Sequence, residues 1–122
     1  MDEYQQSYYK KMLEKDRLIS IRYGEILIGV ITYYIGSDVD KYVRDDPWSV
    51  LEDEPDTGDT CFVDQLITNK GRDNLRFSIV VWKNFINHII KHYPKVNIIR
   101  WNRLKQGVTH AYYYTIRQRA VR

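Results

Sequence analysis

The chain has 122 residues, of which 43% are hydrophobic and 29% are charged, and its formal net charge is +3. These values are typical of one globular domain and exclude an intrinsically disordered chain, so we expect a single domain over residues 1–122. The apolar runs are far shorter than the ~20 residues of a membrane-spanning helix. The single cysteine, Cys61, excludes an internal disulfide and a cysteine-rich zinc site, which predicts a reducing, cytoplasmic setting.

The charges are unevenly distributed along the chain. Residues 36–60 carry nine acidic and two basic residues, a net charge of −7, whereas residues 61–122 carry twelve basic and two acidic residues, a net charge of +10. We expect an acidic loop insertion at 36–60, whose residues Trp48 and Val50 dock on the domain, and a basic tail at 117–122. Solvated charges explain this distribution; a basic surface for phosphates is the alternative interpretation.

The N-terminal third predicts a helix followed by a β-hairpin. Residues 3–16 are good helix formers without Gly or Pro, and one face of this helix contains Tyr4, Tyr8, Met12 and Leu13. Residues 18–35 are rich in β-branched and aromatic residues on both sides of Gly24, which is the expected turn. Gly29, inside the second strand, indicates a bulge or a close backbone approach.

The second half predicts a central strand, a long helix and two further strands. Residues 61–68 are apolar on both faces, as in a central strand, and residues 75–93 form the strongest helical pattern. Strands at 96–104 and 110–116 follow, with a turn at Gly107 between them. The helix stripe expected to face the core comprises Leu75, Ile79, Trp82, Ile86, Ile89 and Tyr93. The order of elements predicts an α+β fold with a mixed, mainly antiparallel sheet and one parallel crossover.

The junction between the strand at 61–68 and the following helix is the most informative place for function. The N-terminus of a helix presents unpaired backbone N–H groups and binds anions. Here the chain adds three basic residues and a flexible glycine, namely Lys70, Gly71, Arg72 and Arg76. The sequence therefore predicts a pyrophosphate site at this junction; the alternative is an ordinary turn with solvated basic side chains.

The order of elements and several segments resemble the GNAT superfamily of N-acetyltransferases. Residues 23–31 resemble the second and third strands of that family, where a turn glycine is followed five residues later by another. Residues 62–68 resemble its fourth strand, and residues 96–101 its fifth. The resemblance covers about residues 18–116 and lies in the arrangement more than in specific residues.

The phosphate loop departs from the usual pattern of the family. Residues 69–76 contain a single glycine, Gly71, whereas the family's loop usually has a glycine and, two residues later, a second glycine or an alanine. In this respect the chain resembles divergent GNAT members, such as toxin-activating acyltransferases and small GNAT-like proteins of phages and mobile elements. The resemblance implies that an acyl group moves from acetyl-CoA, or from the phosphopantetheine of an acyl carrier, to an amine. The amine would belong to a small molecule or a protein.

The resemblance also implies which residues form the site. The backbone of Leu66, Ile67 and Thr68 would hold the pantetheine arm. The phosphate would lie against the loop and the start of the helix, which comprise Lys70, Gly71, Arg72, Asn74, Leu75 and Arg76.

Proton transfer in such a reaction needs a base for the amine and an acid for the thiolate. Asp64 is the candidate base, because burial makes a carboxylate more basic; its structural alternative is an ion pair with Arg100 or Arg103. Tyr112 and Tyr114 share one face of the last strand and are the candidate acids, with simple packing as the alternative.

Two further interpretations remain. His88 and His92 have a spacing that can bind zinc, but no third ligand is near them in the sequence, so we expect no metal. A catalytically inactive GNAT-fold protein that binds a protein or nucleic acid is the alternative function. Its binding surface would interleave basic and aromatic residues, namely Arg100, Trp101, Arg103, Lys105, Tyr112, Tyr114, Arg117 and Arg119.

Overall fold

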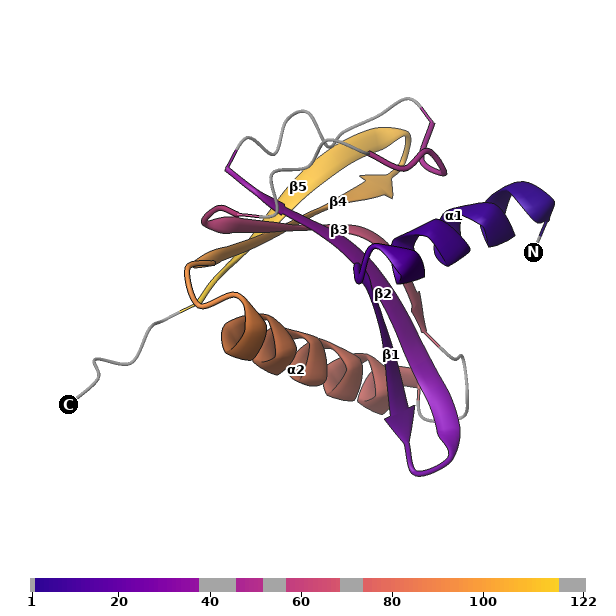
Figure 1. Cartoon of the computed structure of the whole chain (residues 1–122), viewed down its shortest axis with the longest axis horizontal. Helices are drawn as coiled ribbons and strands as arrows, with labels where there is room; N and C mark the ends of the chain where they lie inside the picture. Colours follow the sequence, from indigo (N-terminus) through magenta and orange to yellow (C-terminus); the bar gives the residue numbers. More distant parts are fainter. Residues whose placement is uncertain (1, 38–45, 52–56, 69–73, 117–122) are drawn as a thin grey trace.

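The computed structural model describes residues 2–37, 46–51, 57–68 and 74–116 of the chain (Figure 1). Its elements are α1 (Glu3–Glu14), β1 (Leu18–Tyr23), β2 (Ile26–Gly36), β3 (Thr60–Thr68), α2 (Asn74–His92), β4 (Ile98–Lys105) and β5 (Val108–Thr115). Much of the predicted acidic insertion and all of the predicted basic tail lie outside the described residues. No helix of the described part is long and apolar enough to cross a membrane.

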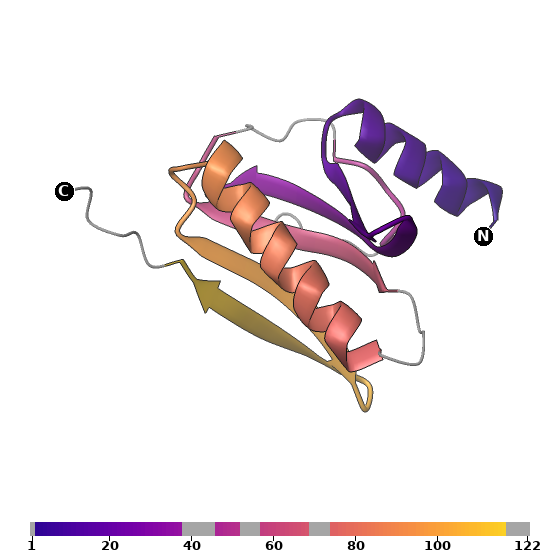
Figure 2. The same ribbon diagram turned by 90° about the horizontal axis from the view of Figure 1, so that it is seen from below.

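The five strands form one mixed sheet whose spatial order follows the chain order, β1-β2-β3-β4-β5. Three neighbouring pairs are antiparallel, and β3 pairs with β4 in parallel through the α2 crossover. Figure 2 shows α2 lying across one face of this sheet. The predicted α+β fold, the mainly antiparallel sheet and the central position of β3 are therefore confirmed.

Alternate residues of β2 and β3 serve two hydrophobic clusters on opposite faces of the sheet. The cluster under α2 includes Val81, Phe85, Ile89, Ile31, Tyr33, Ile35, Cys61 and Val63. The cluster under α1 consists of Tyr8, Met12, Tyr34 and Phe62, and residues 48, 50 and 51 pack against it. Trp48 and Val50 therefore dock on the domain, as predicted.

Helix α1 begins after Asp2, whose side chain caps it by accepting a hydrogen bond from the backbone N–H of Gln5 at 2.8 Å. Its buried residues are Tyr8 and Met12, one turn apart. Tyr4 and Leu13, which the sequence places near this face, are 57% and 61% exposed, so they lie outside the buried part of it. Only a narrow stripe of α1 therefore contacts the sheet.

Helix α2 has the predicted position, but its core face differs from the predicted stripe. Val81, Phe85 and Ile89, spaced four residues apart, are completely buried, whereas Ile79 is 61% exposed. The prediction for Ile79 is wrong because α2 has apolar residues on more than one face, so periodicity alone does not select the buried one. Contact with the sheet selects it, since a side chain on Gly29 would lie 2.6 Å from Val81 Cγ2.

The predicted irregularity at Gly29 is confirmed in both of its forms. The close approach of α2 requires a residue without a side chain at this position. The pairing of β1 with β2 also shifts between Ile21 and Arg22, next to the point where Ile21 faces Gly29. Such a bulge increases the twist of the hairpin.

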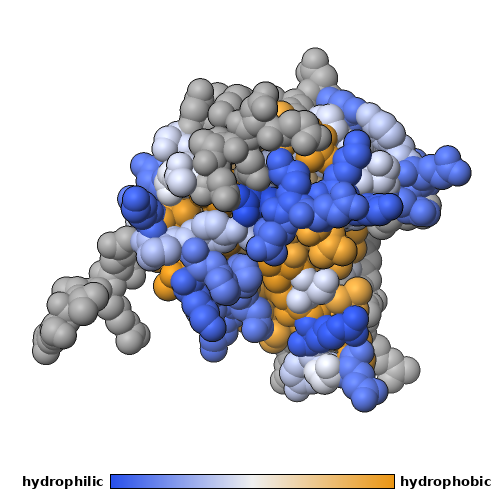
Figure 3. All heavy atoms as spheres, viewed as in Figure 1, coloured by the Kyte–Doolittle hydropathy of each residue, from blue (hydrophilic) through white to orange (hydrophobic). Residues whose placement is uncertain are grey.

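One part of the sheet carries exposed apolar side chains. Figure 3 shows an apolar area below α1, over the hairpin of β1 and β2. Ile26 and Leu27 at the start of β2 are 53% and 41% exposed, and Ile67 near the end of β3 is 42% exposed. Helix α1 therefore covers only part of its face of the sheet.

Candidate functional site

The candidate site is a cleft where β3 and β4 separate. Among the described residues these parallel strands pair at three positions, from Thr60 with Ile98 to Phe62 with Arg100. Beyond Phe62 the described strands diverge, and a cleft of about 540 Å³ opens between them. Its lining comes from β3, β4 and α2 and comprises Val63, Asp64, Gln65, Leu66, Thr68, Ser78, Trp82, Trp101, Asn102 and Arg103.

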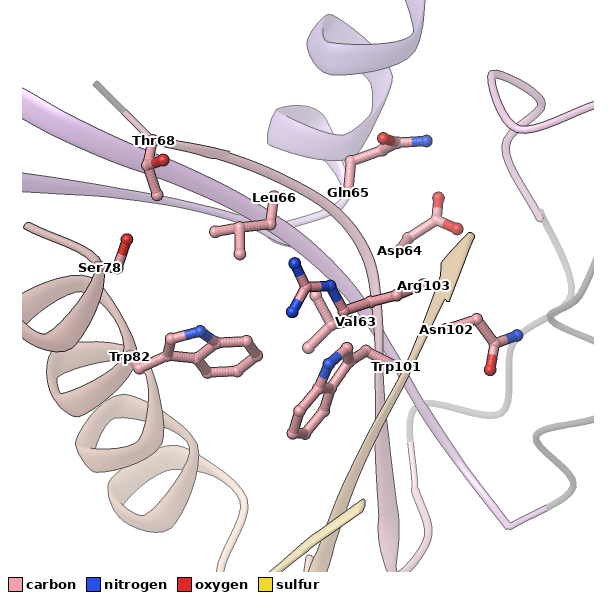
Figure 4. A pocket seen from close by; sticks show the side chains of 10 residues that line it. All are labelled: Val63, Asp64, Gln65, Leu66, Thr68, Ser78, Trp82, Trp101, Asn102 and Arg103. Atoms are coloured by element: carbon pink, nitrogen blue, oxygen red, sulfur yellow. The ribbon is translucent and has the colours of Figure 1, made fainter. Parts of the chain in front are cut away.

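The wall on the α2 side is aromatic and carries a positive charge. The ring centroids of Trp82 and Trp101 lie 4.9 Å apart. Trp101 stacks on Tyr112 of the neighbouring strand, with 5.8 Å between the ring centroids. Figure 4 shows the guanidinium group of Arg103 pointing from β4 towards the gap between Leu66 and the two tryptophans. This side of the cleft suits a flat or apolar group attached to an anion.

The opposite end of the cleft carries a carboxylate. The pairing of β2 with β3 places Thr32 opposite Gln65 and the next residue, Tyr33, opposite Val63, so Asp64 is the additional residue of a β-bulge. A bulge redirects a side chain, and in Figure 4 the Asp64 carboxylate points away from Arg103. Asp64 is half-buried, and its Oδ2 accepts a hydrogen bond from the hydroxyl of Tyr8 at 2.5 Å.

A directed hydrogen-bond chain supports this carboxylate. The backbone N–H of Gln65 donates to Thr32 Oγ1 at 3.0 Å, and Thr32 Oγ1 lies 2.6 Å from the Tyr8 hydroxyl. An ionised carboxylate only accepts, so Tyr8 donates to Asp64 and the Thr32 hydroxyl donates to Tyr8. Burial, followed by the charge of Asp64, raises the pKa of Tyr8 far above its ordinary value, which keeps this hydroxyl protonated as a donor.

A second tyrosine lies near Asp64. Burial and the negative charge of Asp64 both raise the pKa of Tyr9. Its hydroxyl is buried and has no hydrogen-bond partner among the described residues. The rings of Tyr9 and Trp48 pack at 6.0 Å. The carboxylate end of the cleft is therefore bordered by an aromatic cluster with an unused hydroxyl donor.

The structure places the predicted cofactor residues in three groups. Leu66 and Thr68 line the cleft, whereas Ile67, between them on β3, is not one of its lining residues and is 42% exposed. Lys70, Gly71 and Arg72 lie outside the described residues. The positions predicted at the start of the helix, namely Asn74, Leu75 and Arg76, form the first turn of α2, with side chains outside the described part.

The predicted catalytic residues do not all lie together. Asp64 lines the cleft, and Tyr112 reaches it only through its stack on Trp101. Tyr114 pairs with Ile99, is 44% exposed and is not among the residues that line the cleft. The guanidinium carbon of Arg100 lies over the ring of Tyr113, 4.8 Å from the ring centroid.

Sequence reasoning missed several residues of the site. The sequence pattern predicts Tyr8 as a core residue of α1 and does not predict a role for Thr32. Ser78 on α2 and Asn102 on β4 also line the cleft. The one signal for Thr32 is its place between Ile31 and Tyr33 on β2, which directs its hydroxyl to the opposite face of the sheet from these two side chains.

The predicted nucleic-acid surface is divided by the sheet. Trp101 pairs with Tyr112, and Arg100 pairs with Tyr113, so these two couples lie on opposite faces. Arg103 shares the face of Trp101 and lines the cleft. Lys105 belongs to β4, but its side chain lies outside the described part. Arg117 and Arg119 lie entirely outside the described residues.

The two histidines of α2 do lie on one face, with ring centroids 4.3 Å apart. Within the described part of the chain, no group of three or more His, Cys, Asp or Glu residues is placed to hold a metal ion. Cys61 is completely buried in the cluster under α2. The cleft is therefore the place where the described residues combine a cavity with chemically useful side chains.

Comparison of the chain with models of known families finds no match, and comparison with curated proteins also finds none.

Proposed function

We propose that the protein is a divergent GNAT-like acyltransferase that moves an acyl group from coenzyme A, or from the phosphopantetheine of an acyl carrier, to an amine. The observation that carries the proposal is the separation of β3 from β4 after three residue pairs. Pantetheine is an extended chain with two amide groups. Beyond Phe62 the side of β3 that faces away from β2 borders the cleft, where such a chain could lie along the strand as in strand addition to a sheet edge.

The polarity of the cleft supports the same reaction. The phosphates of the donor would lie on the side of Arg103 and of the first turn of α2, where a helix N-terminus and positive charge favour anions. The protonated or neutral amine would approach from the side of Asp64. Donor and acceptor would therefore enter from opposite ends of one cleft.

The proton balance of the reaction assigns a role to Asp64. The amine nitrogen attacks the thioester carbonyl, the C–N bond forms, the C–S bond breaks, and the sulfur leaves as a thiolate. Asp64 takes the proton that the attacking nitrogen releases, held in position by Tyr8. The proton for the thiolate then comes from solvent or from Tyr112, which lies next to the cleft wall.

Tryptophan fluorescence provides the first test. Trp82 and Trp101 line the cleft and lie 4.9 Å apart, so donor binding should change their emission. The wild type and the Trp101→Phe variant are each titrated with coenzyme A and with an acyl carrier. If millimolar coenzyme A causes neither a fluorescence change nor a heat of binding in calorimetry, only the carrier is left as donor.

An acyl-transfer assay provides the second test. Asp64→Asn should abolish transfer and leave the donor titration unchanged, and Tyr8→Phe should slow transfer because Asp64 loses its donor. Glu14→Gln is the matched control, since Glu14 is an exposed carboxylate at the end of α1. Transfer that survives Asp64→Asn would refute the assigned base. Absence of transfer from every donor would refute the enzymatic function.

The alternative function is a GNAT-like fold that binds a partner without catalysis. The stack of Trp101 on Tyr112, with ring planes at 12°, together with Arg103 on the same face, favours single-stranded nucleic acid as that partner. Titration with a single-stranded oligonucleotide distinguishes the two functions. Salt-sensitive binding of the oligonucleotide, with no response to either acyl donor, would favour the binding protein.

A further inference from the structure

The two edges of the sheet differ in their protection against pairing with another strand. The β1 edge has six residues, a bulge between Ile21 and Arg22, and the charged side chain of Arg22. Short length, bulges and charges are the features by which edge strands avoid further pairing. The β1 edge is therefore poorly suited to accept another strand.

The β5 edge has none of these features. Its eight residues, VTHAYYYT, contain no Lys, Arg, Asp, Glu or Pro, although 29% of the chain is charged. Its pairing with β4 runs without a shift from Ile98 with Thr115 to Lys105 with Val108, so the strand is regular. All of its residues except Tyr112 are exposed, including Val108 and Tyr113 at 57% and 61%. Figure 2 shows β5 as the outermost strand beyond β4.

We propose that β5 is a pairing edge and that its partner is β5 of a second copy of this chain. Two identical strands with no formal charge place no like charges opposite one another, so self-pairing has no electrostatic penalty within the strand. Their β-branched and aromatic side chains would gain cross-strand contacts. The product is a ten-stranded sheet that continues through the interface.

Symmetry restricts how the two copies meet. A two-fold axis perpendicular to the sheet makes the strands antiparallel, and paired residues must point to the same face. In an antiparallel pair the numbers of opposite residues have a constant sum, and this sum must be even if both side chains point to the same face. The two-fold axis therefore passes between one residue and the same residue of the second copy. The two registers that pair most of β5 place this axis at Ala111 or at Tyr112. The second register pairs Tyr112 with its copy and His110 with Tyr114.

The surrounding charge predicts how salt acts on this dimer. The nearest described arginines, Arg100 and Arg103, lie on β4, three strand spacings or roughly 14 Å from the β4 of the second copy. Both copies are basic in this half of the chain, so their repulsion opposes association and salt screens it. Added salt should therefore strengthen the dimer, whereas it weakens any complex with nucleic acid.

The test uses the full chain in sedimentation between ~1 µM and ~1 mM protein, at low and at high salt. Ala111→Lys places a charge beside the axis, on an exposed residue, and should raise the dissociation constant of the dimer at least ~10-fold. Ser20→Lys places the same charge on an exposed residue of the β1 edge and should leave it unchanged. Circular dichroism shows that both variants remain folded.

Single cysteines test the register. Cys61 is completely buried, so Ala111→Cys or Tyr112→Cys provides the reactive thiol. Residues on the axis lie about 4.5–5.5 Å apart between Cα atoms, within the range of a disulfide. One of the two variants should therefore cross-link under mild oxidation, and Ser20→Cys should not.

Three results would overturn the proposal. The first is a monomer at all protein concentrations, and the second is a dimer that survives Ala111→Lys or is lost equally with Ser20→Lys. The third is a complex that forms only with added oligonucleotide and weakens with salt, because the β5 edge would then accept nucleic acid.

Discussion

The contact between Gly29 and Val81 makes a quantitative prediction about how the sheet holds α2. A side chain at position 29 would place its Cβ 2.6 Å from Val81 Cγ2 and 3.0 Å from Cγ1. Val81 is completely buried, so it has little room to move. We expect Gly29→Ala to lower the free energy of unfolding by ~1–3 kcal/mol, the usual cost of overpacking.

A double-mutant cycle of Gly29→Ala with Val81→Ala tests this contact, because Val81→Ala removes the side chain that a residue at position 29 would meet. Val81→Ala loses two buried methyl groups at about 0.8 kcal/mol each, or about 1.6 kcal/mol. In the double variant the new methyl group at position 29 enters the space that Val81 leaves. We therefore expect its cost to be near that of Val81→Ala alone, with a coupling energy of roughly 1–3 kcal/mol.

Thermal unfolding measures these differences. At ~2.1 cal/mol/K per residue, the unfolding entropy of this chain is about 0.26 kcal/mol/K, so 1 kcal/mol shifts the melting temperature by about 4 °C. Gly29→Ala should therefore melt ~4–12 °C below the wild type. A variant that melts at the wild-type temperature would refute the contact. Strictly additive costs in the double variant would show that the two residues do not meet.

Two further predictions concern α2. Phe85→Ala should cost ~3–5 kcal/mol, whereas Ile79→Ala, on the exposed face, should stay within ~0.5 kcal/mol; equal losses in chemical denaturation would mean that the helix faces the sheet differently. Burial, and then the charge of His92, lower the pKa of His88 below its ordinary 6.5, so the unfolded chain binds its proton more readily and stability falls as the pH drops below about 6.5. His88→Gln should flatten this part of the stability profile, and a profile as steep as that of the wild type would contradict the assignment.

The elements of the fold could be predicted because their local patterns are strong. The turn at Gln106 and Gly107 has positive φ angles of 52° and 77°, which the glycine favours, and it fixes the β4–β5 hairpin. The face of α2 could not be predicted, because its apolar residues surround more than half of the helix. That choice depends on Gly29, which is remote in sequence.

The candidate site could be predicted only in part for a similar reason. Asp64 stands out as an acidic residue within an apolar strand, and this made it a candidate. Its orientation depends on a bulge, which adds one residue to β3 without any change in composition. Its hydrogen-bond partner Tyr8 is 56 residues away in the sequence, where an apolar helix face is a sufficient explanation for a tyrosine.

The order of the strands has a consequence for how the chain folds. Every strand lies beside its neighbour in sequence, but only the two hairpins, β1–β2 and β4–β5, close through short turns, which form quickly. Residues 37–59 join β2 to β3, and at the parallel junction three residue pairs join β3 to the β4–β5 hairpin. Because this junction is narrow, we expect the β4–β5 hairpin to open separately from β1–β3. Amide hydrogens of β4 and β5 should therefore exchange together, at a rate distinct from that of β2, and a ligand in the cleft would join the two units into one.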